Sequence, residues 1–174
     1  LKALSKADAY FLIGVPFEKA WLDRISSANR EMLIVDTTQG IERMPMSIHH
    51  HHDAEHKEVS VNKEVENPDP HIWLSPRLVK KQIGKIFETL IQLDPKHKET
   101  YRTNLENFQE DIDNLDAEIQ QKLSDVKKRK FMVFHPSWGY FARDYGLEMV
   151  PVEVGGQEPS AAELGEIMTE AKAE

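Results

Sequence analysis

Cysteine is absent from the 174 residues, which excludes disulfides, thiolate metal sites and cysteine nucleophiles. No apolar run approaches the roughly 20 residues that a membrane-spanning helix needs. Acidic residues outnumber basic ones, and a formal net charge of −8 without a basic stripe argues against binding to nucleic acid. What remains is a globular composition, 40% hydrophobic and 30% charged, with room for one or two small domains.

The longest regular pattern predicts an amphipathic helix over residues 94–127. Asp94-Pro95 is a helix-start signal, because a carboxylate can cap free N–H groups and proline suits the first turn. The apolar positions then recur in steps of three and four at Tyr101, Leu105, Phe108, Ile112, Leu115, Ile119, Leu123 and Val126. Such a helix would be about 45 Å long, which indicates a strut or connector.

Strand and helix patterns alternate on both sides of this helix. The predicted strands are 9–13, 32–35, 131–134 and 147–152. The predicted shorter helices are 17–29, 76–93, 137–145 and one that begins at a capping box in 160–163. These patterns predict an α/β fold with parallel sheets. They divide it into a βα lobe at 1–93, the long connecting helix at 94–127 and a second βα lobe at 128–174.

His71 lies in the stretch 67–76, which three prolines stiffen and a capped helix follows. A rigid backbone fixes the imidazole, as a metal ligand requires. Asp69 could bind the second ring nitrogen and so orient the ring. The alternative interpretation is a partly exposed loop histidine with no ligand.

His135 directly follows one predicted strand and precedes a helix. Ligands of α/β proteins usually bind at this carboxyl end of a strand. The alternative is that His135 caps the short helix. Together with His71, at the equivalent place of the other βα group, it predicts a metal site that spans a cleft. Two imidazoles are an incomplete coordination sphere.

A third histidine cluster lies in an acidic loop that we place at 46–60. Its members are His49, His50, His51, His52 and His56. Neutral imidazoles in such a loop bind zinc, nickel or copper weakly and reversibly. The alternatives are a solvated loop without a ligand and an expression artefact.

No residue pattern predicts catalysis. Glu153 and Glu158 follow the last strand and could act as bases, but nothing in the sequence pairs with them. Ser137 is near His135, yet it lacks a Gly-x-Ser-x-Gly elbow and is better explained as a helix cap.

Four spaced segments carry a resemblance to a known family. They are Leu4-Ser-Lys-Ala-Asp8 ahead of a strand and Gly14, Asp69 to Pro76, Phe134 to Ala142 with Tyr145-Gly146-Leu147, and Gln157-Glu-Pro-Ser160. In this order they resemble the metal-specific solute-binding proteins of ABC transporters, the zinc and manganese receptors of the ZnuA/TroA type. The resemblance covers nearly the whole chain.

This resemblance implies two βα lobes joined by a long rigid helix, with metal held in the cleft between them. It implies that His71 is a ligand from the first lobe and His135 a ligand from the second. Zinc (Zn²⁺) is favoured over Mn²⁺, because zinc members carry histidine where many manganese members carry a carboxylate, and imidazole suits zinc better. Zinc members commonly have a His-rich acidic loop where residues 49–58 lie.

The same resemblance implies a piece of a longer protein, incomplete at both ends. Members carry a further histidine ligand upstream of Leu1 and often a carboxylate ligand beyond Glu174. We expect sheet edges left unpaired in such a piece to favour self-association. The implied function is a non-enzymatic zinc receptor, periplasmic or otherwise extracytoplasmic, that delivers zinc to an ABC transporter permease; whether the full-length protein has a lipid anchor stays open.

Two other functions also stay open. One is a zinc-dependent hydrolase that uses His71, His135 and Glu153 around a metal-bound water. The other is a metal-binding adhesin on the same fold.

Overall fold

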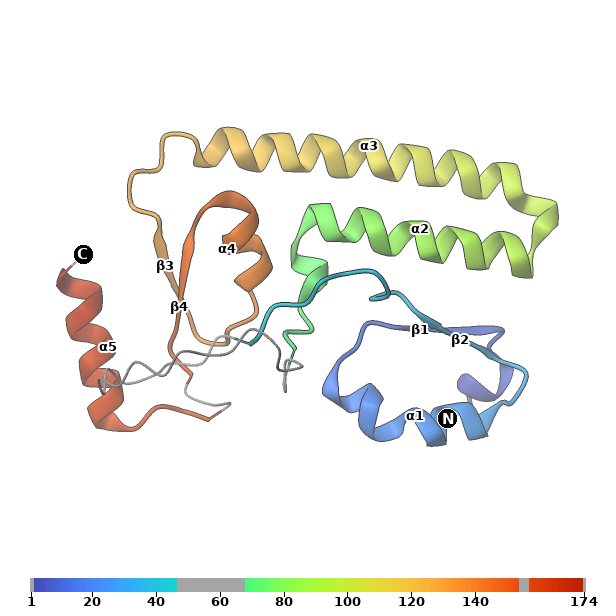
Figure 1. Cartoon of the computed structure of the whole chain (residues 1–174), viewed down its shortest axis with the longest axis horizontal. Helices are drawn as coiled ribbons and strands as arrows, with labels where there is room; N and C mark the ends of the chain where they lie inside the picture. Colours follow the sequence, from blue (N-terminus) through green and yellow to red (C-terminus); the bar gives the residue numbers. More distant parts are fainter. Residues whose placement is uncertain (1, 47–67, 154–156, 174) are drawn as a thin grey trace. The chain divides into compact units, whose positions relative to one another are not determined.

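The computed structural model describes residues 2–46, 68–153 and 157–173 (Figure 1). The chain forms two compact units, each of which combines two separate stretches of sequence. The first unit consists of Leu1–Glu42 and Ser75–Ser124, and the second of Arg43–Leu74 and Asp125–Glu174. The three parts predicted from the sequence are continuous ranges, whereas each of these compact units combines two ranges. The predicted division into two lobes and a connecting helix stays a prediction.

The first unit contains the predicted βαβ segment. Its elements are η1 (Leu4–Lys6), β1 (Ala9–Leu12), α1 (Pro16–Ala28) and β2 (Leu33–Asp36). The two strands are parallel, from Ala9 opposite Leu33 to Leu12 opposite Asp36. Parallel strands need a crossover connection, which α1 provides, and Ile25 is the buried apolar side chain of this helix. The predicted parallel α/β architecture is confirmed here.

A buried carboxylate shapes the turn from β1 into α1. Glu18 is 5% exposed, and its carboxylate accepts hydrogen bonds from the backbone N–H groups of Ile13, Gly14 and Val15 at 2.6–3.2 Å. Glu18 thus provides an acceptor for three N–H groups of the turn, close to the positive end of the α1 dipole. The turn at the carboxyl end of β1 is thereby fixed.

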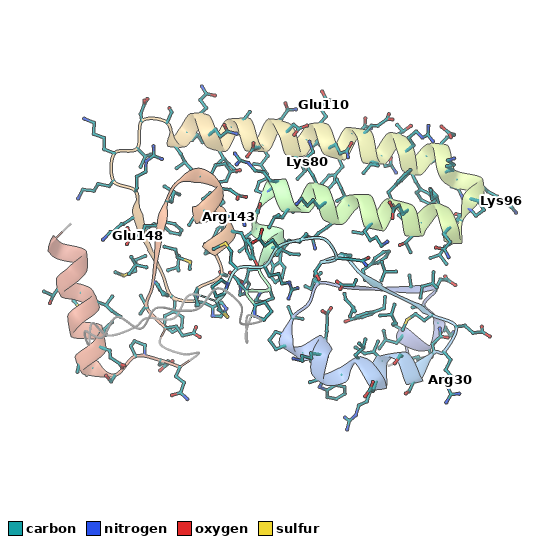
Figure 2. All side chains as sticks on the ribbon, viewed as in Figure 1. Arg30, Lys80, Lys96, Glu110, Arg143 and Glu148 are labelled. Atoms are coloured by element: carbon teal, nitrogen blue, oxygen red, sulfur yellow. The ribbon has the colours of Figure 1, made fainter. Side chains whose placement is uncertain are left out.

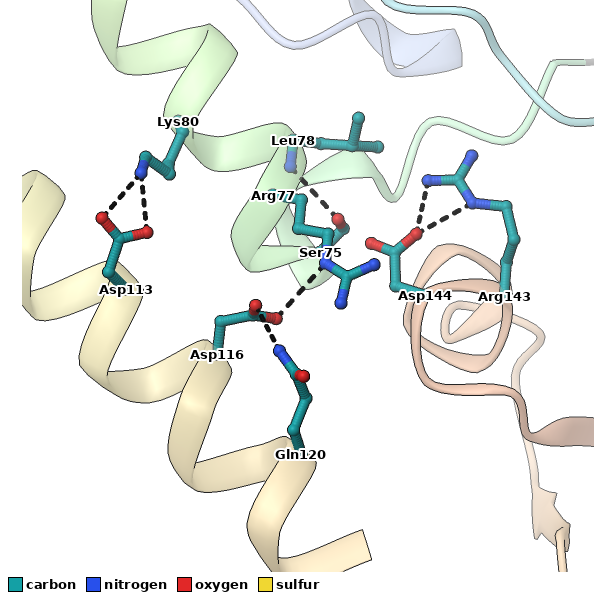
Figure 3. A network of polar contacts seen from close by, with 9 residues as sticks. All are labelled: Ser75, Arg77, Leu78, Lys80, Asp113, Asp116, Gln120, Arg143 and Asp144. Atoms are coloured by element: carbon teal, nitrogen blue, oxygen red, sulfur yellow. Dashed lines mark hydrogen bonds and ion pairs between the residues drawn. The ribbon is translucent and has the colours of Figure 1, made fainter. Parts of the chain in front are cut away.

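Two antiparallel helices complete the first unit. They are α2 (Pro76–Leu93) and α3 (Lys98–Leu123), with the 3-10 turn η3 (Pro95–His97) between them. Lys80 projects from α2 on the side of α3 (Figure 2). Salt bridges join the helices, because Lys80 Nζ lies 2.6 Å from Asp113 Oδ1 and Arg77 Nε lies 3.4 Å from Asp116 Oδ1 (Figure 3). Between the C-terminal half of α2 and the N-terminal half of α3 lies an apolar pocket of about 410 Å³, lined by residues that include Ile86, Phe87, Leu90, Tyr101 and Phe108.

The long helix is shorter than predicted at both ends. It begins at Lys98 rather than Asp94, because Pro95–His97 form the 3-10 turn η3, in which the N–H of His97 donates to the carbonyl oxygen of Asp94 at 3.2 Å. It ends at Leu123, and the N–H of the next residue, Ser124, donates to the carbonyl oxygen of Gln121 at 3.3 Å. The 26 residues of α3 span about 39 Å.

The second unit repeats the βα arrangement. Its elements are η2 (Ile72–Leu74), β3 (Lys130–Val133), α4 (Gly139–Tyr145), β4 (Glu148–Pro151) and α5 (Ala161–Ala173). The strands are parallel, with Lys130 opposite Glu148 and Val133 opposite Pro151. Gly146, with φ 65°, ends α4 in the left-handed conformation that glycine adopts without strain.

The predicted start of α4 at Ser137 is wrong by two residues. The N-cap is Trp138, which makes no side-chain capping bond, and the N–H of Ser137 donates to the carbonyl oxygen of His135 at 2.8 Å. Ser137 therefore belongs to a tight turn and is not the helix cap. The capping box at the start of α5 is confirmed, because Ser160 N–H donates to Glu163 Oε2 at 2.7 Å and Glu163 N–H donates to Ser160 Oγ at 3.3 Å.

Within the stretches that the structure describes, no helix combines the length and the apolar character needed to cross a bilayer.

Candidate metal site

His71 is held by the aspartate two residues before it. Oδ1 of Asp69 lies 2.6 Å from Nδ1 of His71 and accepts the backbone N–H of the same histidine at 2.9 Å. The Asp69 side chain is 2% exposed and that of His71 is 12% exposed. The predicted contact between Asp69 and the second ring nitrogen of His71 is therefore present. The short spacing explains it, since aspartate side chains readily accept the N–H two residues later.

His135 is held in the same way by a residue from the neighbouring strand. Its Nδ1 lies 2.8 Å from Oε2 of Glu153, which is 18 residues later in the chain. Lys130 pairs with Glu148 at the same offset, so His135 and Glu153 occupy equivalent places just beyond the ends of β3 and β4. The backbone extends this pairing, because Glu153 N–H donates to Phe134 O at 2.9 Å.

The sequence analysis missed the role of Glu153. It identified the residue as a candidate base without a partner, whereas its carboxylate accepts from His135. The strand register places residues 18 apart side by side, and the apolar pattern of the sequence does not specify that register. Glu158, the other carboxylate considered there, is exposed.

The two imidazoles lie against each other. Their ring centres are 5.2 Å apart with an angle of 77° between the planes. The ring centre of Trp73 also lies 5.2 Å from that of His71, with an angle of 64° between the planes. His135 is the more open of the two, with 47% of its side chain exposed. Both histidines belong to the second compact unit, so this contact is internal to that unit.

The hydrogen bonds determine which ring atoms can bind a metal. A carboxylate can only accept, so Nδ1 of each ring donates, and the lone pair is on Nε2. A carboxylate behind a histidine is the usual outer partner of a zinc ligand, because it fixes the ring and makes it more basic. A tetrahedral zinc ion with Zn–N bonds of about 2.0–2.1 Å would hold two ring centres roughly 5 Å apart. The observed separation fits that geometry.

The other ligands of such a site are not among these side chains. Within residues 2–46, 68–153 and 157–173, no group of three or more His, Asp or Glu side chains is arranged to hold a metal ion. A structural zinc ion usually takes four ligands, and this pair would supply two of them. His49, His50, His51, His52 and His56 of the predicted loop 46–60 lie outside the described residues.

Parallel βα units, a long helix and a carboxylate-held pair of histidines are the combination expected of a metal-specific solute-binding protein. Over residues 1–174 the chain matches the family ZnuA, described as zinc-uptake complex component A, periplasmic. The chain belongs to this family, and the resemblance seen in the sequence is confirmed.

Two of the relatives with curated descriptions are described as zinc proteins. The high-affinity zinc uptake system protein ZnuA of Bacillus subtilis strain 168 is 37% identical over 106 residues, which is 60% of this chain and 33% of that protein. The zinc-binding protein AdcA of Streptococcus pyogenes serotype M3 (strain ATCC BAA-595 / MGAS315) is 29% identical over 174 residues, which is 94% of this chain and 34% of that protein.

Solved structures share the fold. A crystal structure of ZnuA has a TM-score of 0.84 at 44% identity and covers 98% of this chain and 60% of that chain. A zinc-bound deletion mutant of ZnuA has a TM-score of 0.82, also at 44% identity. The laminin-binding protein of Streptococcus agalactiae, described as an adhesin with metal-transporting activity, has a TM-score of 0.77 at 23% identity, a likeness of fold alone. This chain thus spans about a third of the curated relatives and 60% of the crystallised ZnuA chain.

Proposed function

We propose that this chain is part of a high-affinity zinc receptor, the solute-binding component of an ABC-type metal uptake transporter. The observation that carries the proposal is the pair of imidazoles whose ring centres lie 5.2 Å apart, each with Nδ1 against a carboxylate. His71 and His135 would bind zinc through Nε2, and further ligands would complete the coordination. The two relatives named above support zinc as the cargo, since both are described as zinc proteins.

Zinc rather than manganese follows from the ligand chemistry. Imidazole nitrogen suits zinc, whereas manganese favours oxygen ligands. The only carboxylates in contact with the two imidazoles among the described side chains are Asp69 and Glu153, and both are used to orient the rings. A pair of nitrogen ligands with carboxylates behind them therefore favours zinc.

A receptor role also requires a partner and a location. We infer that the full protein works outside the cytoplasm and passes zinc to a permease in the membrane. The description of the family as a periplasmic component of a zinc-uptake complex supports both inferences. A zinc-binding lipoprotein AdcA of Streptococcus pneumoniae, 37% identical over 101 residues, supports a lipid anchor as one way to stay at the membrane.

We further infer that the chain is not an enzyme. A zinc hydrolase would need Glu153 as a base beside a metal-bound water. Its carboxylate is instead hydrogen-bonded to His135 and only 12% exposed, a role that orients a ligand. The solute-binding family to which the chain belongs points in the same direction.

Zinc titration of three histidine variants tests the site. We expect His71→Ala and His135→Ala each to weaken zinc binding at least tenfold in a competition titration against a chromophoric chelator, because each removes one ligand. His97→Ala is the matched control. Its imidazole also lies 2.6 Å from an aspartate, Asp94, but at an exposed turn of the first unit, where its aromatic neighbour is Tyr101 and not a histidine among the described residues.

A fourth variant separates this site from the histidine-rich loop. Replacing His49, His50, His51, His52 and His56 by serine should leave the tight binding event in place and remove only weak binding. Loss of all zinc binding in that variant, or equal losses in His97→Ala and His71→Ala, would contradict the proposal.

A further inference from the structure

Tyr140 is a fully buried side chain, 0% exposed, at the start of α4. Its hydroxyl donates to the carbonyl oxygen of Asp69 at 2.8 Å and accepts from the backbone N–H of Met44 at 3.1 Å. Met44 closes a ring of hydrogen bonds, because its own carbonyl oxygen accepts from the N–H of Asp69 at 2.8 Å. One phenol hydroxyl therefore fixes the backbone from which Asp69 projects.

Gly139 confines the same aspartate from the side-chain end. A Cβ atom at residue 139 would lie 3.1 Å from Oδ2 of Asp69 and 3.8 Å from Cε of Met44. The backbone of Gly139 is not in the left-handed region, so glycine is needed here for space and not for conformation. Because Asp69 is 1% exposed, its carboxylate would have to move within packed surroundings to admit a methyl group.

These contacts lead to the imidazole of His71. Asp69 is the residue that holds both Nδ1 and the backbone N–H of His71. The other histidine, His135, lies four residues before Gly139, across the tight turn in which Ser137 N–H donates to His135 O. One short segment thus carries one imidazole and fixes the carboxylate that orients the other.

We propose that Gly139 and Tyr140 are positioning residues of the zinc site, which set the imidazole of His71 against that of His135 without contact with the metal. The zinc part of this inference rests on the proposed function, whereas the orientation of His71 can be measured in metal-free protein. Residues behind metal ligands typically change affinity by about 10–100-fold when altered. Gly139 and Tyr140 act one contact further out, so effects at or below the lower bound are expected.

The test compares Tyr140→Phe and Gly139→Ala with two controls. Gly165→Ala adds a methyl group in α5, where nothing lies within 4 Å of the new atom. Tyr101→Phe removes a hydroxyl that donates to Asp94 at 3.0 Å in the first unit. For each protein we would record the ¹⁵N signals of the His71 ring without metal, the zinc affinity and the thermal unfolding temperature.

We expect the ring signals to show the Nδ1–H tautomer in the unaltered chain and a mixture in Gly139→Ala, with zinc affinity lowered about tenfold. In Tyr140→Phe the phenyl ring of residue 140 stays in place and only the hydroxyl is lost, so zinc affinity should fall about threefold. The two controls should change neither the His71 ring signals nor the zinc affinity. Unaltered His71 signals would overturn the inference even if stability falls, because the two residues would then serve packing alone. Unaltered zinc affinity in a protein that needs His71 would overturn it as well. Altered signals in a protein whose zinc affinity does not depend on His71 would support the positioning and contradict the proposed function.

Discussion

At the scale of single residues, the two imidazole–carboxylate pairs differ in how they arise. Asp69 and His71 are two residues apart, so the pair forms locally and the sequence predicts it. His135 and Glu153 meet only because β3 and β4 are parallel in one particular register. Apolar patterns locate strands but do not specify which residues of two strands lie side by side. The first pair was therefore predictable from the chain alone, and the second was not.

Glu153→Gln tests the outer partner of His135. The amide is a weaker acceptor than the carboxylate that now lies 2.8 Å from Nδ1, so we expect zinc affinity to fall about 10–100-fold. Glu158→Gln is the control, because this substitution removes the same charge from an exposed side chain of the same segment. Competition titration of both variants gives the comparison, and equal affinities would show that Glu153 does not orient His135.

At the scale of secondary structure, each predicted strand lies within a residue or two of an observed one. The discrepancies fall at the ends of helices, where the sequence signals are shared by several turn types. Asp94-Pro95 predicts a helix N-terminus, yet it begins the 3-10 turn η3, and α3 starts only at Lys98. The side chain of Asp94 instead accepts from Tyr101 and contacts His97 Nδ1 at 2.6 Å. Such contacts depend on the turn that is formed and cannot be inferred from spacing.

This turn gives a pH-dependent prediction for the α2–α3 hairpin. The hydrogen bond with His97, followed by that with Tyr101, holds the pKa of Asp94 below its usual value of about 3.9. The ionised form is thus favoured in the folded state. Its contribution to the free energy of unfolding is complete above about pH 4 and is lost as pH falls through the lower, folded-state pKa.

We expect Asp94→Asn to be slightly less stable than the unaltered chain at pH 6, with the difference disappearing toward pH 2. Urea unfolding followed by circular dichroism from pH 2 to pH 6 measures it. A stability difference that is independent of pH would mean that the carboxylate charge is not involved.

At the scale of the whole molecule, residues 43–74 belong with the second unit although they precede α2 and α3 in the chain. The sequence gives no sign of this return. It is marked by hydrogen bonds between distant residues, because the Tyr140 hydroxyl donates to the carbonyl oxygen of Asp69 and accepts from the N–H of Met44. His71 and His135 lie in one unit as a result. The lobes of the complete receptor stay a prediction from the family resemblance.

Zinc should therefore stabilise the second unit selectively. A ligand at 100 times its Kd adds about 2.7 kcal/mol to the state that binds it. We expect zinc to slow hydrogen exchange by local opening in β3, α4 and residues 68–74, with little change in β1 and β2. The double variant His71→Ala/His135→Ala should lose this protection. Equal protection of both units, or protection that persists in the double variant, would place the bound zinc elsewhere.

Pro45 and Pro68 form an antiparallel bridge, and Asp69 N–H donates to Met44 O beside it. The two segments that flank the histidine run are therefore joined to each other by backbone contacts. The free energy of closing a loop changes only slowly with its length. We therefore expect insertions, deletions and changes of composition between residues 46 and 68 to leave the geometry of the imidazole pair unchanged, because the flanking segments stay joined.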